Sequence, residues 1–344
     1  MAATGQGRVI GIDYLRAFFS VCVVAVHLNY LFPSLIFSPE HFSEHTFSTS
    51  DFINFYVLCL AVPVFILIAT YLYARKPTDF NGLLKRIGRL TRLLVFWSIL
   101  FQVYYLTGLG AVKSLPNNFR DLGLYVMTGG NTVYYFFLSL ALVTIVTHYA
   151  MRLSTPMVWG LFAASTFLVG VLPILQRKTE IVFLAHHANP LNFVPYAFAG
   201  IGLSRLMETG ARRQMNLIGL ACLALAIPAA LLDWTVYVDA CFFEVNQFAI
   251  PAYTRPSLVF LGVAVMVLAV QTQRLGNSLV AFMAFHSLAV YCLHPFFVDI
   301  KFKLIEVLGL TQPLATFVPI IIVLGLSYVG SIVMPLFLRH EMIR

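Results

Sequence analysis

The sequence predicts an all-α integral membrane protein, one bundle of about ten transmembrane helices formed by a single domain over residues 1–344. Three observations predict it. Hydrophobic residues make up 60% of the chain and charged residues only 10%, whereas a soluble domain carries about 25% charged residues. The mean hydropathy is +0.86, so most of the surface is expected to face lipid. Apolar runs of about 20 residues, the length that a helix needs to cross a bilayer, also use nearly the whole chain and leave no room for a soluble domain of useful size.

Polar breaks separate these runs and give ten approximate spans. The first run is expected to remain as a helix and not to be removed as a signal peptide, because it carries Asp13 and Arg16, is too long and lacks a clean small-residue cleavage site. In chain order the predicted spans are 11–31, 52–74, 90–108, 131–150, 156–175, 191–207, 215–232, 257–272, 279–299 and 313–338.

The charges favour a topology with both termini in the cytoplasm. With ten spans and a cytoplasmic N-terminus, 14 of the 22 Lys and Arg residues fall in cytoplasmic segments, seven fall in outer segments and Arg16 lies in the first span. Of the 14 acidic residues, three lie inside, ten outside and Asp13 in the membrane. Cytoplasmic loops carry an excess of Lys and Arg, so this bias supports the topology. Because the basic residues are scattered between apolar runs, the net charge of +8 does not indicate nucleic-acid binding.

Cysteine usage indicates neither a disulfide framework nor a metal site. Four of the five cysteines lie inside apolar runs, where free cysteine behaves as a small buried hydrophobe. Cys241 lies in a predicted outer loop without an obvious partner, and no C-x-x-C spacing is present. We therefore expect no bound metal.

The first predicted span carries the most informative polar residues. Its sequence, GIDYLRAFFSVCVVAVHLN, contains Asp13, Arg16, Ser20 and His27. Arg16 and His27 share one helical face about 16 Å apart along the axis, and Asp13 and Ser20 fall on the same stripe. Charges inside a span usually face a bundle interior or a wet cavity, which predicts a polar path that reaches His27. Simple pairing of Asp13 with Arg16 near the inner interface, with His27 bonded to a neighbouring helix, is equally open.

A second polar stripe lies in the ninth span. In FHSLAVYCLHP, Ser287, Tyr291 and His294 are spaced i, i+4 and i+7 and share one face. Ser and Tyr in membrane helices also serve simply as hydrogen-bonding contacts between helices, and that alternative stays open for this segment.

A basic run, KRIGRLTR, follows the second span. Lys85, Arg89 and Arg92 fall on one helical face, with Arg86 adjacent. Such a run is typical of a cytoplasmic anchor, and its side chains also suit the phosphates of a cytoplasmic ligand.

Two predicted outer segments mix aromatic rings with polar groups. Segment 176–196 contains His186, His187 and two asparagines, and segment 233–256 contains carboxylates, tyrosines and Trp234. This composition suits sugar binding and equally suits an interfacial aromatic belt.

Together these motifs resemble acyltransferase family 3, a family of polytopic membrane O-acyltransferases. The best-known mark of that family is Arg or Lys, ten residues and then His in the first helix, which is similar to Arg16 and His27 here, with Asp13 at the position of the family's usual acid. The family pattern S-x-x-x-Y-x-x-H-P closely resembles the segment that runs from Ser287 to Pro295.

Weaker similarities cover most of the remaining chain in order. KRIGRLTR resembles the family's arginine motif through Arg86, Arg89 and Arg92, without the usual Pro. TVYYFFLSLAL resembles a His-Leu-Trp-Phe-Leu stretch, with Tyr134 and Tyr135 in place of His and Trp. VPVFILIATYLYARK and PLNFVPYAFAGIGLSR resemble two further family stretches loosely. These departures affect substrate details more than the reaction class.

The resemblance implies an acyl-CoA donor made in the cytoplasm, with acetyl as the family's commonest acyl group. It implies an acceptor hydroxyl on an extracytoplasmic glycan or lipid-linked saccharide, such as an exopolysaccharide. It also implies a multi-pass protein of the bacterial inner membrane, surrounded by membrane lipids, with no permanently bound cofactor.

The resemblance also implies roles for single residues. His27 is expected to act as general base, because the unperturbed pKa of histidine lies near the working pH, with Arg16 and Asp13 supporting it. His27 as a covalent acyl carrier stays open. Residues expected to contact the donor are Ser20, Arg86, Arg89 and Arg92. Residues expected to line the channel or acceptor side are Tyr134, Tyr135, Ser287, Tyr291 and His294.

The principal alternative is a transporter for a small polar solute or a lipid-linked sugar, because charged residues within spans also mark ion and proton paths. Transporters often contain two related halves, and no half-to-half similarity is visible here. A structural membrane subunit is a third possibility, but it leaves the polar stripe of the first span without a reason.

Overall fold

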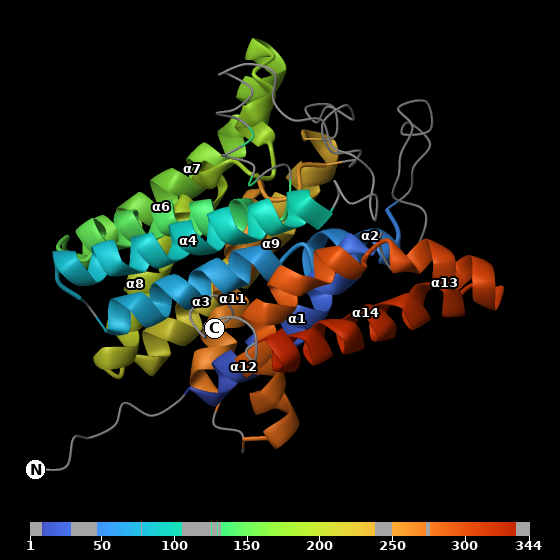
Figure 1. Cartoon of the computed structure of the whole chain (residues 1–344). Helices are drawn as coiled ribbons and strands as arrows, with labels where there is room; N and C mark the ends of the chain where they lie inside the picture. Colours follow the sequence, from blue (N-terminus) through green and yellow to red (C-terminus); the bar gives the residue numbers. More distant parts are fainter. Residues whose placement is uncertain are drawn as a thin grey trace, which may run out of the picture.

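The computed structural model describes residues 9–28, 47–76, 78–104, 125, 129, 132–237, 250–272 and 276–334. Within these ranges the regular secondary structure is entirely helical (Figure 1). The elements are α1 (Ile10–His27), α2 (Thr49–Phe52), η3 (Ile53–Leu58), α3 (Ala61–Arg75), α4 (Phe80–Tyr104), α6 (Tyr135–Ala150), α7 (Thr155–Thr179), η5 (Val182–Ala185), η6 (Pro190–Phe193), α8 (Val194–Glu208), α9 (Arg212–Thr235), α11 (Pro256–Gln271), α12 (Ser278–Leu293), η7 (His294–Phe297), α13 (Ile300–Leu308) and α14 (Leu314–Val333).

Every predicted span overlaps at least one of these helices, and the all-α prediction is confirmed for the described residues. Seven segments are long and apolar enough to cross a membrane, and α6 and α11 are apolar but have only 16 residues each. Helix α8 has 15 residues. Because a crossing helix needs about 20 residues, the count of about ten crossings stays a prediction. The location of both termini in the cytoplasm also stays a prediction. The seven segments are Ile10–His27, Thr49–Arg75, Phe80–Tyr104, Thr155–Thr179, Arg212–Thr235, Ser278–Phe297 and Leu314–Val333.

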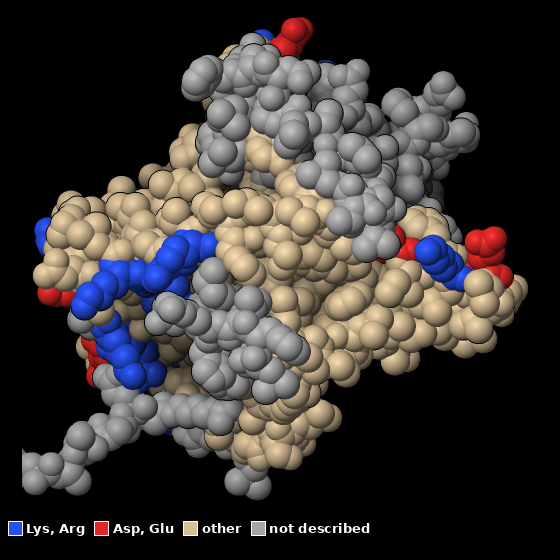
Figure 2. Space-filling view, viewed as in Figure 1, with Lys and Arg blue, Asp and Glu red and all other residues tan. Residues whose placement is uncertain are grey.

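The outer faces of several helices expose large apolar side chains. Phe167 of α7 is 74% exposed, Leu220 of α9 64% and Leu268 of α11 70%. Figure 2 shows a broad surface without charged side chains across the middle of the molecule, with Lys, Arg, Asp and Glu towards its ends. Extended apolar surface is rare on soluble monomers, so these faces suit contact with lipid.

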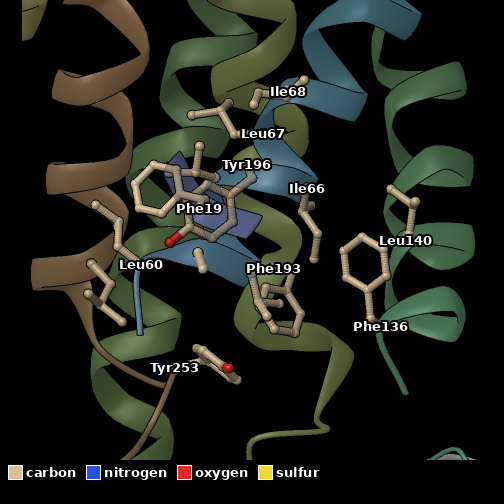
Figure 3. Close-up of a cluster of buried hydrophobic side chains, with 14 of the residues drawn as sticks. Phe19, Leu60, Ile66, Leu67, Ile68, Phe136, Leu140, Phe193, Tyr196 and Tyr253 are labelled. Carbon is tan, nitrogen blue, oxygen red and sulfur yellow. The ribbon is translucent and has the colours of Figure 1, made fainter. Parts of the chain in front are cut away.

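Helix α1 lies inside the bundle and contacts α3, α11, α12 and α14. Its Val24 is fully buried and Phe19 is 2% exposed. Figure 3 shows Phe19 in the core with Leu60, Ile66 and Tyr196, which come from the chain around α3 and from α8. On its buried side such a helix can carry polar side chains only where neighbouring helices bond to them or leave a cavity.

Two glycines let the helices around α1 and α3 approach closely. A Cβ atom on Gly11 of α1 would collide with the backbone of Ala269 in α11, and one on Gly200 of α8 would collide with Thr70 of α3. The Thr70 hydroxyl donates to the Tyr196 carbonyl at 2.9 Å. Small residues permit such close contact between membrane helices, and these contacts join α1, α3, α8 and α11.

Candidate active site

The two polar stripes of the sequence meet at the C-terminal end of α1. His27 is the last residue of α1, and His294 begins η7 directly after α12. Their ring centroids are 5.0 Å apart. Pro295 follows His294 and has no N–H group to continue the α-helical hydrogen bonding, which explains why α12 ends here. The structure thus brings together two histidines that lie far apart in the sequence.

His294 is held in one tautomer by its own helix. Its Nδ1 atom lies 3.1 Å from the carbonyl oxygen of Val290, and because a carbonyl can only accept, Nδ1 carries the proton. The Nε2 atom is then an acceptor, and it is buried without a hydrogen-bond partner among the described residues. Leaving a buried acceptor unpaired costs about 1–3 kcal/mol. A hydroxyl group that reached Nε2 would remove this penalty.

Two tyrosines join α12 to the chain that enters α6. The Tyr291 hydroxyl donates to the carbonyl of Val133, and the Tyr134 hydroxyl donates to the carbonyl of Cys292 at 2.8 Å. The Tyr291 ring lies edge-on to His294 with centroids 5.9 Å apart. Both phenols are therefore engaged by backbone carbonyls, and their described contacts position the helix that carries His294.

The loop between α7 and α8 adds His187 to the site. The His187 ring lies edge-on to Tyr135, with centroids 5.1 Å apart, and it is close enough to His27 for an electrostatic interaction. Tyr253 lies next to Tyr135, at 6.4 Å between centroids. The sequence placed His187 in a predicted outer loop but gave it no catalytic role, because a loop position carries no helical periodicity that could relate it to His27.

Amide side chains hold this loop in place. Asn189 donates to the Leu184 carbonyl and Asn192 donates to the His186 carbonyl, both at 2.9 Å. The His186 ring stacks on His187 with centroids 4.2 Å apart. Burial, and then the nearby His187, lower the pKa of His186 to about 3. His186 is therefore neutral at physiological pH.

Farther along α1, Arg16 links the two stripes a second time. Its Nε atom donates to the Ser287 hydroxyl at 3.2 Å, and Ser287 donates to the Ala284 carbonyl at 2.9 Å. The Ser20 hydroxyl lies 3.2 Å from the hydroxyl of Tyr328 in α14. The predicted face of α1 thus contacts α12 and α14 through polar groups between Arg16 and His27.

A cavity of about 720 Å³ opens at the N-terminal end of this stripe. Its walls come from α1, from the last turn of α3 and from the start of α12. The polar residues that line it are Asp13, Arg16, Arg75 and Lys76, and the aromatic ones are Phe282 and Phe285. The polar stripe therefore joins a charged cavity at one end to a cluster of histidines at the other.

The comparison with protein families decides the class of this chain. A family model described as an acyltransferase domain, Acyl_transf_3, matches residues 9–334. The chain belongs to acyltransferase family 3. No curated protein and no solved structure matches the chain. With its apolar helices and this family, the chain is a multi-pass membrane acyltransferase.

The basic run of this acyltransferase lies along α4. Figure 2 shows Lys and Arg side chains gathered at the end of the molecule where α3 ends and α4 begins, around a hollow. Arg89 and Arg92 are exposed. Arg86 is partly buried and lies over the Tyr73 ring, 5.0 Å from its centroid, and Tyr73 in turn bonds to His148 at 2.9 Å. The donor-binding role of these three arginines stays a prediction.

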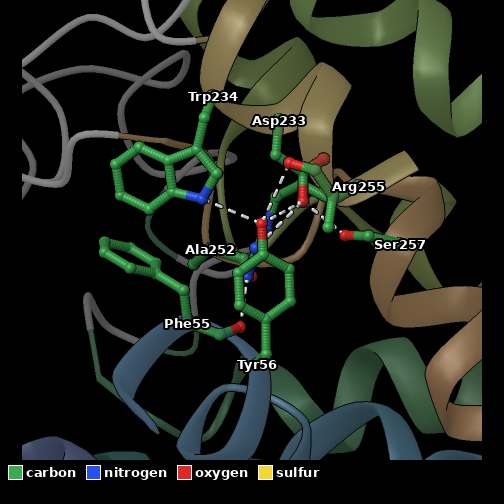
Figure 4. A network of polar contacts seen from close by, with 8 residues as sticks. Phe55, Tyr56, Asp233, Trp234, Ala252, Arg255 and Ser257 are labelled. Atoms are coloured by element: carbon green, nitrogen blue, oxygen red, sulfur yellow. Dashed lines mark hydrogen bonds and ion pairs between the residues drawn. The ribbon is translucent and has the colours of Figure 1, made fainter. Parts of the chain in front are cut away.

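A buried polar network occupies the segment that was considered for sugar binding (Figure 4). Asp233 and Arg255 form an ion pair at 3.3 Å and both side chains are 0% exposed. Tyr56 donates to Asp233 at 3.0 Å and accepts from the Trp234 indole at 2.9 Å. This network joins η3, α9 and the start of α11. Its acidic and basic groups therefore bind one another inside the protein, and Cys241 lies outside the described residues.

Proposed function

We propose that this acyltransferase moves an acyl group, acetyl in the first instance, from cytoplasmic acyl-CoA to a hydroxyl of an extracytoplasmic glycan or lipid-linked saccharide. The location is the inner membrane of a bacterium, with both termini in the cytoplasm. No permanently bound cofactor is required, because acyl-CoA arrives as a substrate.

One observation carries the proposal. A single helix, α1, has a charged cavity at its N-terminal end and His27 beside His294 at its C-terminal end. The stripe between Arg16 and His27 is about 16 Å long, comparable to the pantetheine arm of CoA. Tyr328 of α14 lies beside Ser20 of this stripe, so the arm has to pass this tyrosine. A donor held at one end could then present its thioester to an acceptor at the other.

In the proposed reaction His27 acts as general base. It takes the proton of the acceptor hydroxyl as the oxygen attacks the thioester carbonyl carbon, so that a C–O bond forms and the C–S bond breaks. The proton then passes from His27 to the departing CoA sulfur, which leaves as the thiol, and the base returns to its starting state. General base catalysis of this kind contributes about 10²- to 10⁴-fold in rate.

His294 and Arg16 have separate roles in this reaction, His294 beside His27 and Arg16 at the far end of the stripe. The unpaired Nε2 atom of His294 can accept a hydrogen bond from a neighbouring hydroxyl of the acceptor sugar, so that the attacking hydroxyl keeps its own proton for His27. Arg16, fixed by Ser287, lines the donor path with Asp13 and Ser20. Tyr134, Tyr135 and Tyr291 shape the acceptor side.

The experiment uses the purified full chain in detergent with labelled acetyl-CoA and a crude glycan extract from the source organism. Wild type is compared with His27→Ala and Arg16→Ala. His286→Gln serves as the control, because His286 lies on α12 one position before Ser287 but bonds to Ser331 of α14 at 3.0 Å. Transfer to glycan and equilibrium binding of CoA are measured in the same preparations.

We expect transfer by wild type and by His286→Gln, and a loss of at least about 100-fold in His27→Ala with CoA still bound. Equal transfer by His27→Ala would reject its role as base. Label trapped on His27 in a single turnover would replace direct transfer by a covalent intermediate. If wild type bound no CoA, the donor assignment would fail and a transporter would become the better interpretation.

A further inference from the structure

We propose that Arg75 and Lys76, at the end of α3, bind the phosphate groups of the CoA donor in the cavity beside Arg16. This inference rests on the proposed function and identifies where the anionic part of its donor is held. The basic run of α4 was the sequence-based candidate for this task, whereas neither Arg75 nor Lys76 was considered for it.

The cavity has the size and the lining of a nucleotide site. Its volume of about 720 Å³ falls within the range of about 300–1,000 Å³ that is usual for small-molecule sites. Arg75 and Lys76 line it from the end of α3 and Arg16 from α1, while Phe282 and Phe285 line it from α12. Cationic side chains suit phosphates, and aromatic faces suit a nucleobase.

The charges of this cavity are unbalanced in favour of an anion. Among the described residues that line it, three are cations, and Asp13 supplies one carboxylate. Neither Arg75 nor Lys76 forms an ion pair with a carboxylate of the described residues. No charged residue of α12 lines the cavity within the described part of the chain. A ligand that carries several negative charges would therefore be attracted here.

The guanidinium of Arg75 has unused hydrogen-bonding capacity. It lies over the Tyr71 ring, 5.8 Å from the centroid, and its buried Nε atom has no hydrogen-bond partner among the described residues. Arginine donates in a planar fork that matches two phosphate oxygens. Arg75 also lines the cavity, so a phosphate bound there could accept hydrogen bonds from its guanidinium.

The basic run of α4 is less well placed for this role. Arg86 lies against α3, where its Nη2 atom is 3.5 Å from the Ala69 carbonyl, and Arg89 and Arg92 are exposed. Among the residues that line the cavity none comes from α4. Arg75 and Lys76, by contrast, share the cavity with Arg16, from which the polar stripe continues to His27.

A second cavity extends this site along α12. It measures about 330 Å³ and shares Asp13 and Ala281 with the first. Gly276, Asn277 and Ser278, around the N-terminus of α12, also line it. The two cavities together give a ligand with a nucleoside and several phosphates more room than the first alone.

The test measures binding to the purified full chain in detergent by isothermal titration calorimetry, with CoA and with pantetheine, which lacks every phosphate. The variant is Arg75→Gln combined with Lys76→Gln. The matched control is Arg212→Gln combined with Arg213→Gln, an adjacent exposed basic pair at the start of α9. Acetyl transfer at saturating acetyl-CoA is followed in parallel.

We expect the Arg75 and Lys76 variant to bind CoA about 10- to 100-fold more weakly, because two charge-assisted contacts are lost. Its pantetheine affinity should equal that of wild type, and the control pair should leave both affinities unchanged. Unchanged CoA affinity in the variant would overturn the inference. The proposed function would still stand in that case, provided that wild type binds CoA and transfers the acetyl group.

Two further outcomes would also overturn it. An equal fall in CoA and pantetheine affinity would mean that the substitutions disturb the fold and do not remove a phosphate contact. Binding of phosphatidylglycerol to wild type that is lost in the variant, while the CoA affinity of the variant stays at the wild-type value, would assign the cavity to a lipid headgroup. Wild type that bound no CoA at all would reject the proposed function and this inference together.

Discussion

Removal of the Asp233 carboxylate is expected to destabilise the protein strongly. Asp233 and Arg255 are both 0% exposed and pair at 3.3 Å, and the Tyr56 hydroxyl also donates to Asp233 at 3.0 Å. In Asp233→Leu the guanidinium stays buried without its counter-charge. Removing one partner of a buried ion pair costs about 3–5 kcal/mol, so we expect a loss of that size in the free energy of unfolding.

The assay is thermal or denaturant unfolding of purified protein in one fixed detergent, followed by tryptophan fluorescence. Asp233→Leu and Arg255→Met are measured singly and together, with Glu306→Gln as an exposed control on α13. Replacing both partners by apolar residues removes the isolated charge, so the double variant should be more stable than either single variant. A double-mutant cycle then gives the coupling between the two positions.

The reasoning fails if Asp233→Leu is as stable as wild type, or if the double variant is no more stable than the singles. The same network contains the Ala252 carbonyl, which accepts from Arg255 at 3.1 Å, and Tyr253 follows directly and lies beside Tyr135. Loss of the network should therefore also lower transfer activity.

Three further outcomes are expected. His294→Leu should lower acetyl transfer at least about tenfold while CoA affinity stays at the wild-type value, because leucine has no acceptor in place of Nε2. Unchanged transfer would contradict this. Lys301→Met should destabilise the protein by about 1 kcal/mol, because Lys301 donates to the Leu28 carbonyl at the end of α1 at 2.9 Å, whereas Lys303→Met, an exposed neighbour, should not. The pKa of His186 is lowered from 6.5 to about 3, so the stability that neutral His186 contributes is present above pH 6.5 and is lost as the pH falls from 6.5 towards 3. The unfolding temperature of His186→Phe should therefore fall less steeply than that of wild type over this pH range. An equal slope would refute the assignment.

Helical periodicity predicted which residues share a face, but not which faces meet. The spacing of Arg16 and His27, and separately of Ser287 and His294, correctly described two stripes. Their contact depends on how α1 and α12 pack side by side, and that packing is set by many side chains spread over both helices. The resemblance to a family suggested one site, and the ring contact of His27 with His294 supplies its geometry.

Other parts of the account needed the three-dimensional structure. Arg75 and Lys76 read in the sequence as an ordinary positive end of a span, and only the position of α3 beside α1 places them in a cavity with Arg16. His187 lies in a loop whose path is set by Asn189 and Asn192. Hydropathy located the helices themselves well, because a lipid-facing surface constrains composition over long stretches.

The most direct test of the central claim is acetyl transfer across a membrane. The protein is reconstituted in sealed vesicles with labelled acetyl-CoA on one side and the glycan extract on the other, for wild type and His27→Ala. The account predicts labelled glycan when donor and acceptor lie on opposite sides, in the orientation that exposes Arg75 and Lys76 to the donor, and none with His27→Ala. Transfer only when both substrates share one side, or undiminished transfer by His27→Ala, would contradict it.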